Sequence, residues 1–322
     1  MEYILTFVVL LAAELLYFRI ADKLNIIDKP NERSSHTRIT LRGGGIIFYL
    51  GALAYFIISG WEYPWFIGGL TLIAGISFMD DVHSVPNRIR LLCHFAAMLL
   101  MFYQLGLLTE FPWWYIIVAL VVCTGIINAY NFMDGINGIT GGYSLVVLGT
   151  LAIINNRIST FIEPDFLYIS LLGVCVFCLF NFRKKAKCFA GDVGSVSIAF
   201  IILFALGKLI LTTGDLSYIG LLAVYGVDSV LTIVHRLLLK ENIFQPHRKH
   251  AYQLLANELK WPHVAVSTLY MVVQVIIAGA FILFPQQHWL VLIVSIVILS
   301  IAYIGFMKRY FKLAVNKNKN KN

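Results

Sequence analysis

Residues 194–212 read GSVSIAFIILFALGKLILT, an almost unbroken apolar run that contains one charged residue, Lys208. A helix needs about 20 mostly apolar residues to cross the hydrocarbon core of a bilayer. Similar runs recur along the 322-residue chain, which is 59% hydrophobic and only 13% charged, with a mean hydropathy of +0.80. Soluble domains carry about 25% charged residues. The composition therefore excludes a water-soluble enzyme, and also disordered, collagen-like and disulfide-scaffold proteins.

The apolar runs predict an all-α, polytopic integral membrane protein with about eleven transmembrane helices. The expected spans are residues 3–21, 44–60, 64–79, 89–107, 112–129, 138–154, 165–181, 194–212, 216–237, 264–284 and 288–307. Tight turns between several of them imply antiparallel neighbours. We expect residues 1–315 to form a single transmembrane domain and the Lys/Asn-rich residues 316–322 to form a disordered basic tail.

The positive charges predict how the chain is oriented. All but three of the 25 Lys and Arg residues lie in alternate loops or in the tail, the exceptions being Arg19, Arg157 and Lys208. Because Lys and Arg are retained on the cytosolic side, the N-terminus is predicted outside and the C-terminus in the cytosol. The membrane would be a bacterial inner membrane or plasma membrane. The net charge of +8 is spread over short loops, so we expect no nucleic-acid partner.

Side chains that could take part in catalysis or ligand binding gather in the predicted cytosolic loops and at the adjoining helix ends. The clusters are His36 with Arg42 and the glycines 43–45, the pair Asp80–Asp81, residues 128–138, residues 191–195 and residues 246–250. A transporter would instead place ionisable groups near the middle of the membrane. Few lie well inside the spans, namely Glu14, Lys208 and Asp228. The pattern favours one site at the cytosolic interface.

Two of the clusters carry carboxylates that suit a divalent cation. Asp80 and Asp81 are neighbouring hard-oxygen groups, able to bind Mg²⁺ or to act as one ligand and one base, although such a pair can also cap a turn or face water. Asp192 lies in a glycine-rich loop that opens a helix, where free N–H groups attract anions. Its carboxylate would hold Mg²⁺ against a diphosphate or serve only as an N-cap.

Asn128, Asn131, Asp134 and Asn137 recur every three residues, which places them on one face of a helix. Polar groups entering a membrane helix are costly unless they face partners. They indicate either a polar ligand or a polar seam between packed helices.

His247, Arg248, Lys249 and His250 form a compact group of cationic or protonatable side chains. Arg binds phosphate with two hydrogen bonds and His donates near neutral pH, so a phosphate clamp is one interpretation. A solvated basic patch that contacts lipid head groups is the other. A metal site on the two histidines is less favoured, because the intervening cations would repel the ion.

Taken in order, these motifs resemble the polyprenyl-phosphate N-acetylhexosamine-1-phosphate transferases of glycosyltransferase family 4. That family includes phospho-N-acetylmuramoyl-pentapeptide transferase and the GlcNAc-1-phosphate transferases that start O-antigen and teichoic-acid synthesis. The resemblance covers residues 28–253, and the eleven-span layout agrees with the GlcNAc branch. It passes through Asp28-x-Pro30, Arg42-Gly-Gly-Gly45, Asp80-Asp81, Arg88-x-Arg90, Asn128-x-x-Asn131-x-x-Asp134-Gly-x-x-Gly138, Gly191-Asp192-x-Gly-Ser195 and the histidine loop.

The resemblance implies a catalytic membrane domain with a cytosolic active site. It would transfer an N-acetylhexosamine-1-phosphate from a UDP-sugar to polyprenyl (undecaprenyl) phosphate, release UMP, and initiate a cell-surface polysaccharide such as O-antigen, capsule or teichoic acid. The alternatives are the pentapeptide transferase of peptidoglycan synthesis and a non-enzymatic, lipid-linked transporter or flippase. Its partners would be UDP-N-acetylhexosamine, polyprenyl phosphate and membrane lipids, with a homodimer left open.

The resemblance also implies residue roles. Asp192 and Asp80 would bind Mg²⁺, with Mn²⁺ as the alternative ion. The catalytic groups would be Asp80, Asp81, His247 and His250. The implied substrate-binding residues are Arg42, Arg88, Arg90, Asn128, Asn131, Asp134, Asn137, Phe189, Arg248 and Lys249.

Two departures from the family pattern affect the substrate. Residue 137 is Asn where many members have Asp, although Phe189 matches an aromatic residue that stacks on uracil in the pentapeptide branch. The loop reads PHRKHAYQ over residues 246–253 rather than carrying consecutive histidines, which argues against the peptidoglycan substrate. It looks more like O-antigen members that take 6-deoxy sugars such as N-acetylfucosamine. We favour direct attack by the lipid phosphate over a covalent aspartyl-phosphosugar.

Overall fold

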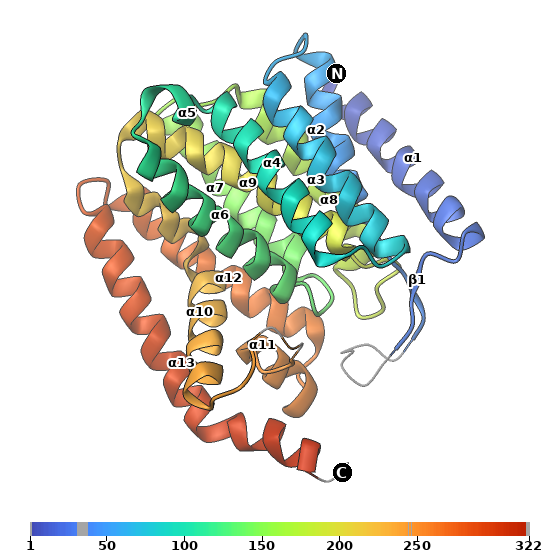
Figure 1. Ribbon diagram of the computed structural model, residues 1–322, viewed down its shortest axis with the longest axis vertical. Helices are drawn as coiled ribbons and strands as arrows, with labels where there is room; N and C mark the ends of the chain where they lie inside the picture. Colours follow the sequence, from blue (N-terminus) through green and yellow to red (C-terminus); the bar gives the residue numbers. More distant parts are fainter. Residues whose placement is uncertain (1, 31–37, 244, 246, 320–322) are drawn as a thin grey trace.

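The computed structural model describes residues 2–30, 38–243, 245 and 247–319, with side chains described as far as residue 311. Almost all of this part of the chain is helical (Figure 1). The elements are α1 (Glu2–Lys23), β1 (Ile27–Asp28), β2 (Thr40–Leu41), α2 (Ile46–Ile58), α3 (Pro64–Val82), α4 (Asn87–Gln104), α5 (Leu107–Glu110), α6 (Trp113–Met133), α7 (Ile139–Arg157), α8 (Pro164–Asn181), α9 (Gly191–Thr213), η1 (Leu216–Leu222), α10 (Ala223–Leu238), α11 (Ala251–Gln253), η2 (Leu254–Glu258), α12 (His263–Leu283) and α13 (His288–Lys319).

Within the described residues, nine helical segments are long and apolar enough to cross a membrane: α1, α3, α6, α7, α8, α9, the combined segment Leu216–Leu238, α12 and α13. This confirms an all-helical, polytopic membrane protein. Two of the predicted spans correspond to helices outside this set. Helix α2 has only 13 residues, and α4 begins with Asn87, Arg88 and Arg90. The number of eleven spans and the orientation stay predictions.

The segment predicted as one span over residues 216–237 is a broken helix. Residues Leu216–Leu222 form the 3₁₀ helix η1, and an α-helix begins only at Ala223. The side chain of Gln274, on α12, meets the break: its Oε1 accepts from the backbone N–H of Val224 at 3.3 Å, and its Nε2 donates to the carbonyl of Gly220 at 3.4 Å. Backbone groups released by the break therefore find a partner inside the bundle, as a membrane interior requires.

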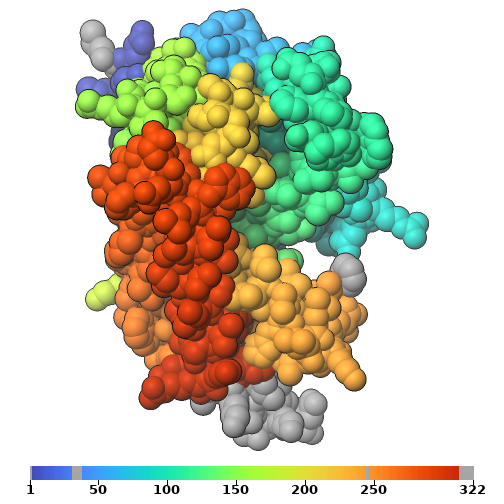
Figure 2. All heavy atoms as spheres, turned by 90° about the vertical axis from the view of Figure 1, so that its left-hand side faces the viewer, coloured from blue at the N-terminus to red at the C-terminus, as the bar shows by residue number. Residues whose placement is uncertain are grey.

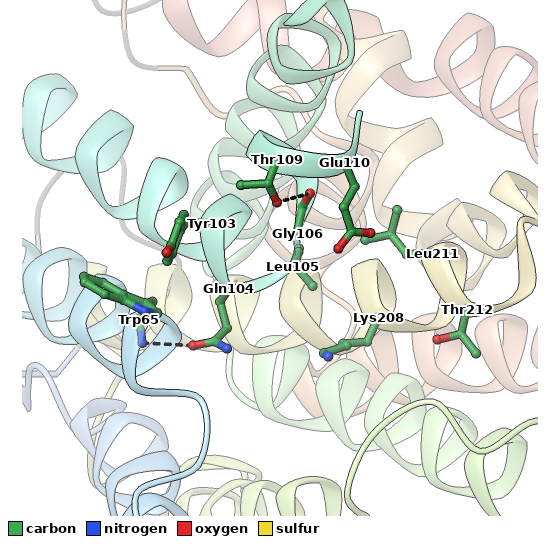
Figure 3. Close-up of a pocket in the computed structure, with 10 residues that line it drawn as sticks. All are labelled: Trp65, Tyr103, Gln104, Leu105, Gly106, Thr109, Glu110, Lys208, Leu211 and Thr212. Carbon is green, nitrogen blue, oxygen red and sulfur yellow. Dashed lines mark hydrogen bonds between the residues drawn. The ribbon is translucent and has the colours of Figure 1, made fainter. Parts of the chain in front are cut away.

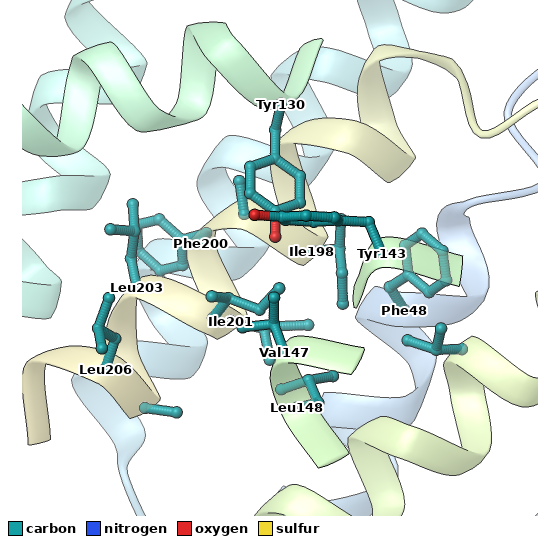
Figure 4. Packing of buried hydrophobic residues seen from close by; sticks show 14 of the residues in the cluster. Phe48, Tyr130, Tyr143, Val147, Leu148, Ile198, Phe200, Ile201, Leu203 and Leu206 are labelled. Carbon is teal, nitrogen blue, oxygen red and sulfur yellow. The ribbon is translucent and has the colours of Figure 1, made fainter. Parts of the chain in front are cut away.

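Helix α9 forms the centre of the bundle, because it is apolar around its whole circumference. Its buried side chains pack against α2, α3, α6 and α7, and Figure 4 shows part of this core. The labelled residues are Phe48, Tyr130, Tyr143, Val147, Leu148, Ile198, Phe200, Ile201, Leu203 and Leu206.

The start of α9 lies very close to the segment that precedes α2. A Cβ added to Gly45 would lie 2.3 Å from the Cα of Gly194, so the two backbones pack with no room for a side chain. Strand β2 pairs antiparallel with β1, and Leu41 bridges Cys188. These contacts fix the residues after β2 against the N-terminal turn of α9.

The helix ends that carry the motif residues share one end of the bundle (Figure 1). The C-terminal ends of α3, α6 and α10 and the N-terminal ends of α4 and α9 lie there, together with β1 and α11. Figure 2 views the molecule from the side along which α13 runs, with α10 and the loop after it alongside. The fold thus brings distant motifs to one end.

Candidate active site

Five side chains from four parts of the chain meet at this end. We call them the acid cluster: Arg42 after β2, Asp80 and Asp81 in the last turn of α3, Arg90 in the first turn of α4, and Asp192 in the first turn of α9. Three carboxylates are therefore placed against two guanidinium groups.

Asp81 is the carboxylate of the acid cluster that is buried and accepts hydrogen bonds through both of its oxygens. Its Oδ1 lies 2.7 Å from Nε of Arg42, and its two oxygens accept the backbone N–H groups of Asp192 and Val193 at 2.9 Å each. Its side chain is 0% exposed. A carboxylate at this place accepts hydrogen bonds from N–H groups in the first turn of α9 that have no partner within the helix. The positive end of the α9 dipole also stabilises its negative charge. Asp81 therefore ties α3 and Arg42 to the start of α9.

Asp80 and Asp192 are held less completely. Asp80 accepts the backbone N–H of Val85 at 2.7 Å and pairs with Nη1 of Arg90 at 2.5 Å. Asp192 makes only long ion pairs, at 3.5 Å to Arg42 and 3.6 Å to Arg90, and its side chain is 19% exposed. The carboxyl groups of Asp80 and Asp192 also lie within hydrogen-bonding reach of each other. Two carboxyl groups this close need a proton or a cation between them.

Asn131 and Asp134 extend the acid cluster from α6. Oδ1 of Asn131 accepts the hydroxyl of Ser195 at 3.2 Å, one turn into α9. Asp134 follows the last residue of α6 and accepts the hydroxyl of Thr140 at 2.7 Å. Burial, together with the nearby negative charges of Asp192 and Asp81, raises the pKa of Asp134 to about 7. The predicted polar ligand face thus meets the acid cluster at these two positions.

His250 is fixed by a carboxylate inside the predicted ninth span. Its Nδ1 lies 3.3 Å from Oδ1 of Asp228, which also accepts the N–H of Ala251 at 3.1 Å. The other oxygen of Asp228 accepts the hydroxyl of Tyr270 at 2.6 Å. Nε2 of His250 is buried and has no partner among the described residues. The sequence offered one signal for this pair, because a carboxylate inside a membrane span demands a partner.

His247 lies beside His250, with 5.0 Å between the ring centroids. Burial, together with the neighbouring His250, Arg236 and Lys249, lowers the pKa of His247 to about 3, so the imidazole is neutral. The ring of Phe132 lies 6.3 Å from each histidine. Two residues after Phe132 comes Asp134, so the end of α6 joins the histidines to the acid cluster.

A mostly apolar groove of about 940 Å³ starts at the two histidines and runs between α6, η1–α10 and α13. Asn128 and Phe132 line it near His247 and His250, and residues such as Ile219, Leu292 and Ile296 line its apolar part. Asn128 therefore faces this groove. α10 and α13, which form two of its walls, are visible in Figure 2.

Asn137 and Phe189 have local structural contacts. Nδ2 of Asn137 donates to the carbonyls of Arg183 at 3.0 Å and Lys184 at 3.3 Å, and the residue is 5% exposed. Its amide therefore fastens the loop between α8 and α9. The backbone of Phe189 pairs with Leu41 and Gly44, which leaves its half-buried ring next to the segment that carries Arg42.

The remaining predicted residues lie at the edge of the site or beyond it. Arg88 is exposed at the start of α4. Arg248 pairs with Glu258 at 3.5 Å, and Lys249 pairs with Glu241. Both predicted phosphate-clamp cations are thus engaged by carboxylates. His36 lies outside the described residues.

A family model matches the part of the chain that carries several of these motifs. The family model for glycosyl transferase family 4 matches residues 63–209, a range that contains Asp80, Asp81, Asn131, Asp134 and Asp192. This central part of the chain is similar to glycosyl transferase family 4. The family match covers the three carboxylates of the acid cluster, whereas Arg42 and the histidine loop lie outside it.

Curated relatives match this chain over most of their length. A probable undecaprenyl-phosphate N-acetylglucosaminyl 1-phosphate transferase from Bacillus subtilis (strain 168) is 24% identical, over 91% of this chain and 88% of its own. The undecaprenyl-phosphate alpha-N-acetylglucosaminyl 1-phosphate transferase of Thermotoga maritima is 26% identical, over 75% of this chain and 77% of its own. The protein of the same name from Escherichia coli O157:H7 is 24% identical, over 92% and 87%.

Proposed function

We propose that this protein transfers N-acetylglucosamine-1-phosphate from UDP-N-acetylglucosamine to undecaprenyl phosphate and releases UMP. One observation carries the proposal: the acid cluster and an apolar groove that ends at two histidines meet at the same end of the bundle. The names of the relatives support this sugar over the 6-deoxy sugars and over the pentapeptide substrate. We infer that the product initiates a cell-surface polysaccharide.

The reaction brings two negatively charged groups together. An oxygen of the lipid phosphate attacks the β-phosphorus of the UDP-sugar, and the bond from that phosphorus to the bridging oxygen breaks as UMP leaves. The lipid phosphate is mostly a dianion at pH 7, because its second pKa is about 6. Arg42 and Arg90 are placed to offset the repulsion, since both reach the open carboxylate Asp192.

The donor set fits Mg²⁺. Asp80 and Asp192 lie within hydrogen-bonding reach of each other, and the oxygens of Asp192 are engaged only at 3.5 Å and beyond by Arg42 and Arg90. No three His, Cys, Asp or Glu side chains in the described ranges are grouped to hold a metal alone. Mg²⁺ is commonly held by one or two carboxylates, water and substrate phosphates. Asp192 and Asp80 would hold the ion, which would neutralise charge on the diphosphate.

The contacts of Asp80 and Asp81 favour direct attack by the lipid phosphate. A carboxylate nucleophile needs a free lone pair aimed at phosphorus. Asp81 accepts three hydrogen bonds and is 0% exposed, and Asp80 is held by Val85 and Arg90. We therefore assign both residues to positioning. Intact-mass measurement of protein mixed with UDP-N-acetylglucosamine alone should detect no phosphosugar adduct, and an adduct on either residue would overturn this assignment.

The groove suits the polyprenyl chain of the acceptor. Its lining is mostly apolar, and His247 and His250 stand where it meets the polar end of the bundle. Nε2 of His250 is buried and has no partner in the part of the chain that the structure describes, so we infer that it can contact a phosphate oxygen. We infer that the head of the acceptor lies at the histidines and its chain follows α6 and α13 into the membrane. The site would face the cytosol of an inner or plasma membrane, and a homodimer stays a prediction.

A reconstituted assay tests the proposal. Purified protein is mixed with undecaprenyl phosphate, Mg²⁺ and a panel of labelled UDP-N-acetylhexosamines. We expect a lipid-linked product and UMP from the N-acetylglucosamine donor, and exchange of labelled UMP back into that donor. A folded preparation that forms a product only with the pentapeptide donor, or that yields no lipid-linked product with any donor, would overturn the proposal.

A further inference from the structure

A second polar pocket lies at the opposite end of the helices that carry the acid cluster. It has a volume of about 570 Å³, within the range of ligand pockets, and lies between the start of α3, the end of α4, α5 and the second half of α9 (Figure 3). We call it the distal pocket; its main lining residues are Trp65, Tyr103, Gln104, Thr109, Glu110 and Lys208. Nothing in the proposed transferase reaction uses it.

The distal pocket belongs to the other boundary of the membrane. Along α9, Lys208 follows Asp192 by sixteen residues, which at 1.5 Å per residue is about 24 Å. The hydrocarbon core of a bilayer is about 30 Å thick. Trp65 and Tyr103 pack edge to face at 5.1 Å, and both are about half exposed. Such amphipathic rings concentrate at the level of lipid head groups.

The distal pocket is held in shape by hydrogen bonds that do not involve its charged side chains, Lys208 and Glu110. Oε1 of Gln104 accepts the backbone N–H of Trp65 at 3.0 Å, which fixes the end of α4 to the start of α3. The hydroxyl of Thr109 donates to the carbonyl of Gly106 at 3.2 Å and fixes the turn before α5 (Figure 3). These two contacts hold the walls of the distal pocket in place.

Its two opposite charges are not paired with each other. Lys208 and Glu110 both line the distal pocket, yet neither has an ion-pair partner within 4.0 Å among the described residues. The amine of Lys208 lies 5.3 Å from the ring centroid of Tyr63. Lys208 is also the one charged residue in an otherwise apolar stretch of α9, where a charge is costly unless it meets a partner. A ligand that carries an anion and a cation would engage both side chains.

We propose that the distal pocket binds the head group of a zwitterionic phospholipid, with its phosphate at Lys208 and its ammonium at Glu110. The aromatic rim supports the membrane as the source of the ligand, because Trp65 and Tyr103 are exposed at the mouth of the pocket. Below the rim, exposed apolar side chains such as Leu72 on α3 and Leu99 on α4 provide a surface for acyl chains. The lipid would be a bound membrane component, separate from the polyprenyl substrate.

Native mass spectrometry of the full-length protein tests this site, with phosphatidylethanolamine and phosphatidylglycerol as probes. Lys208→Met should weaken the binding of both lipids about tenfold, because both need the cation for their phosphate. Glu110→Gln should weaken the binding of phosphatidylethanolamine alone. Lys208→Arg, which keeps the positive charge, should bind both lipids as the wild type does. Arg157→Gln is the matched control, since it removes an exposed charge at the end of α7.

All variants should keep wild-type UMP exchange, because the distal pocket is remote from the acid cluster; this also reports that they are folded. If Lys208→Met does not fold, Glu110→Gln decides the question through the two lipids. The proposal is overturned if Glu110→Gln binds both lipids as the wild type does. It is also overturned if soluble glycerophosphoethanolamine competes as well as the intact lipid, since the ligand would then be a free metabolite.

Discussion

The acid cluster and the histidine loop differ in how far along the chain their contacts reach. Asp81 holds the N–H groups at the start of α9 across 111 residues of sequence. In the histidine loop, His250 finds Asp228 only 22 residues away, and Lys249 finds Glu241 within eight. The acid cluster can therefore form only when the bundle is assembled, whereas the loop is largely stabilised by its neighbours in sequence.

The charge balance of the two regions differs as well. The acid cluster places three carboxylates against Arg42 and Arg90, an excess of negative charge that suits a cation. In the histidine loop, Lys249 has Glu241 and His250 has Asp228. This contrast supports our proposal that the metal and the diphosphate lie at the acid cluster and the lipid phosphate at the histidines.

The largest expected effect is the loss of the contact that assembles the acid cluster. Asp81→Asn should lower the free energy of unfolding by about 3–5 kcal/mol, because it leaves the guanidinium of Arg42 without its buried partner. Asp80→Asn should cost much less, since that carboxylate is partly exposed. Thermal or chemical unfolding in detergent measures both.

A double variant sharpens this prediction. Asp81→Asn combined with Arg42→Met should be less destabilised than the sum of the two single variants, because the second change removes the uncompensated charge. Strict additivity would show that Asp81 acts only by capping α9 and that the ion pair contributes nothing.

The next prediction separates a loss of catalytic rate from a loss of stability. Asp192→Asn should lower kcat about 10²–10³-fold with little loss of stability, because this carboxylate makes only long ion pairs yet is the most available ligand for a cation. Asp22→Asn, an exposed carboxylate near the end of α1, is the matched control. Full Mg²⁺-dependent turnover by Asp192→Asn would remove the metal assignment.

The fold class could be predicted because the membrane leaves the backbone few choices. Apolar runs in lipid must satisfy their own hydrogen bonds, so each predicted run corresponds to helical structure. The break between η1 and α10 could not be predicted, since it depends on Gln274 about fifty residues further along the chain. Helix α2 is shorter than its predicted span, because apolar character alone does not fix where a helix ends.

The candidate site was predictable in its residue types and less so in its contacts. Motif chemistry selected Asp81 and Asp192, and the structure brings them together. The spacing of three residues grouped Asn137 with Asp134, but α6 ends at Met133, so the shared helical face stops there and Asn137 turns to the carbonyls of Arg183 and Lys184. Spacing describes neighbours only as long as the helix continues.

A smaller effect should appear in the pH dependence of stability. The pKa of Asp134 is raised from 3.8 to about 7, so between those values the unfolded chain has released a proton that the folded chain keeps. Stability then falls as pH rises, by about 2 kcal/mol from pH 5.5 to pH 7. Asp134→Asn should remove this slope, and unfolding measured at both pH values checks it. Identical slopes in variant and wild type would mean that other groups cause it.

The smallest effect tests whether the histidine loop serves the lipid alone. Asp228→Asn keeps an acceptor for Nδ1 of His250 but removes the negative charge that faces the imidazole. Contact with the lipid phosphate should weaken, so KM for undecaprenyl phosphate should rise about tenfold, the loss of one charge-assisted contact. The KM for the UDP-sugar should stay unchanged, because that substrate is assigned to the acid cluster. Thr232→Val, which removes another hydrogen bond to Asp228, is the control. Equal changes in both KM values would show that the two regions act as one site, and the contrast between them would fail.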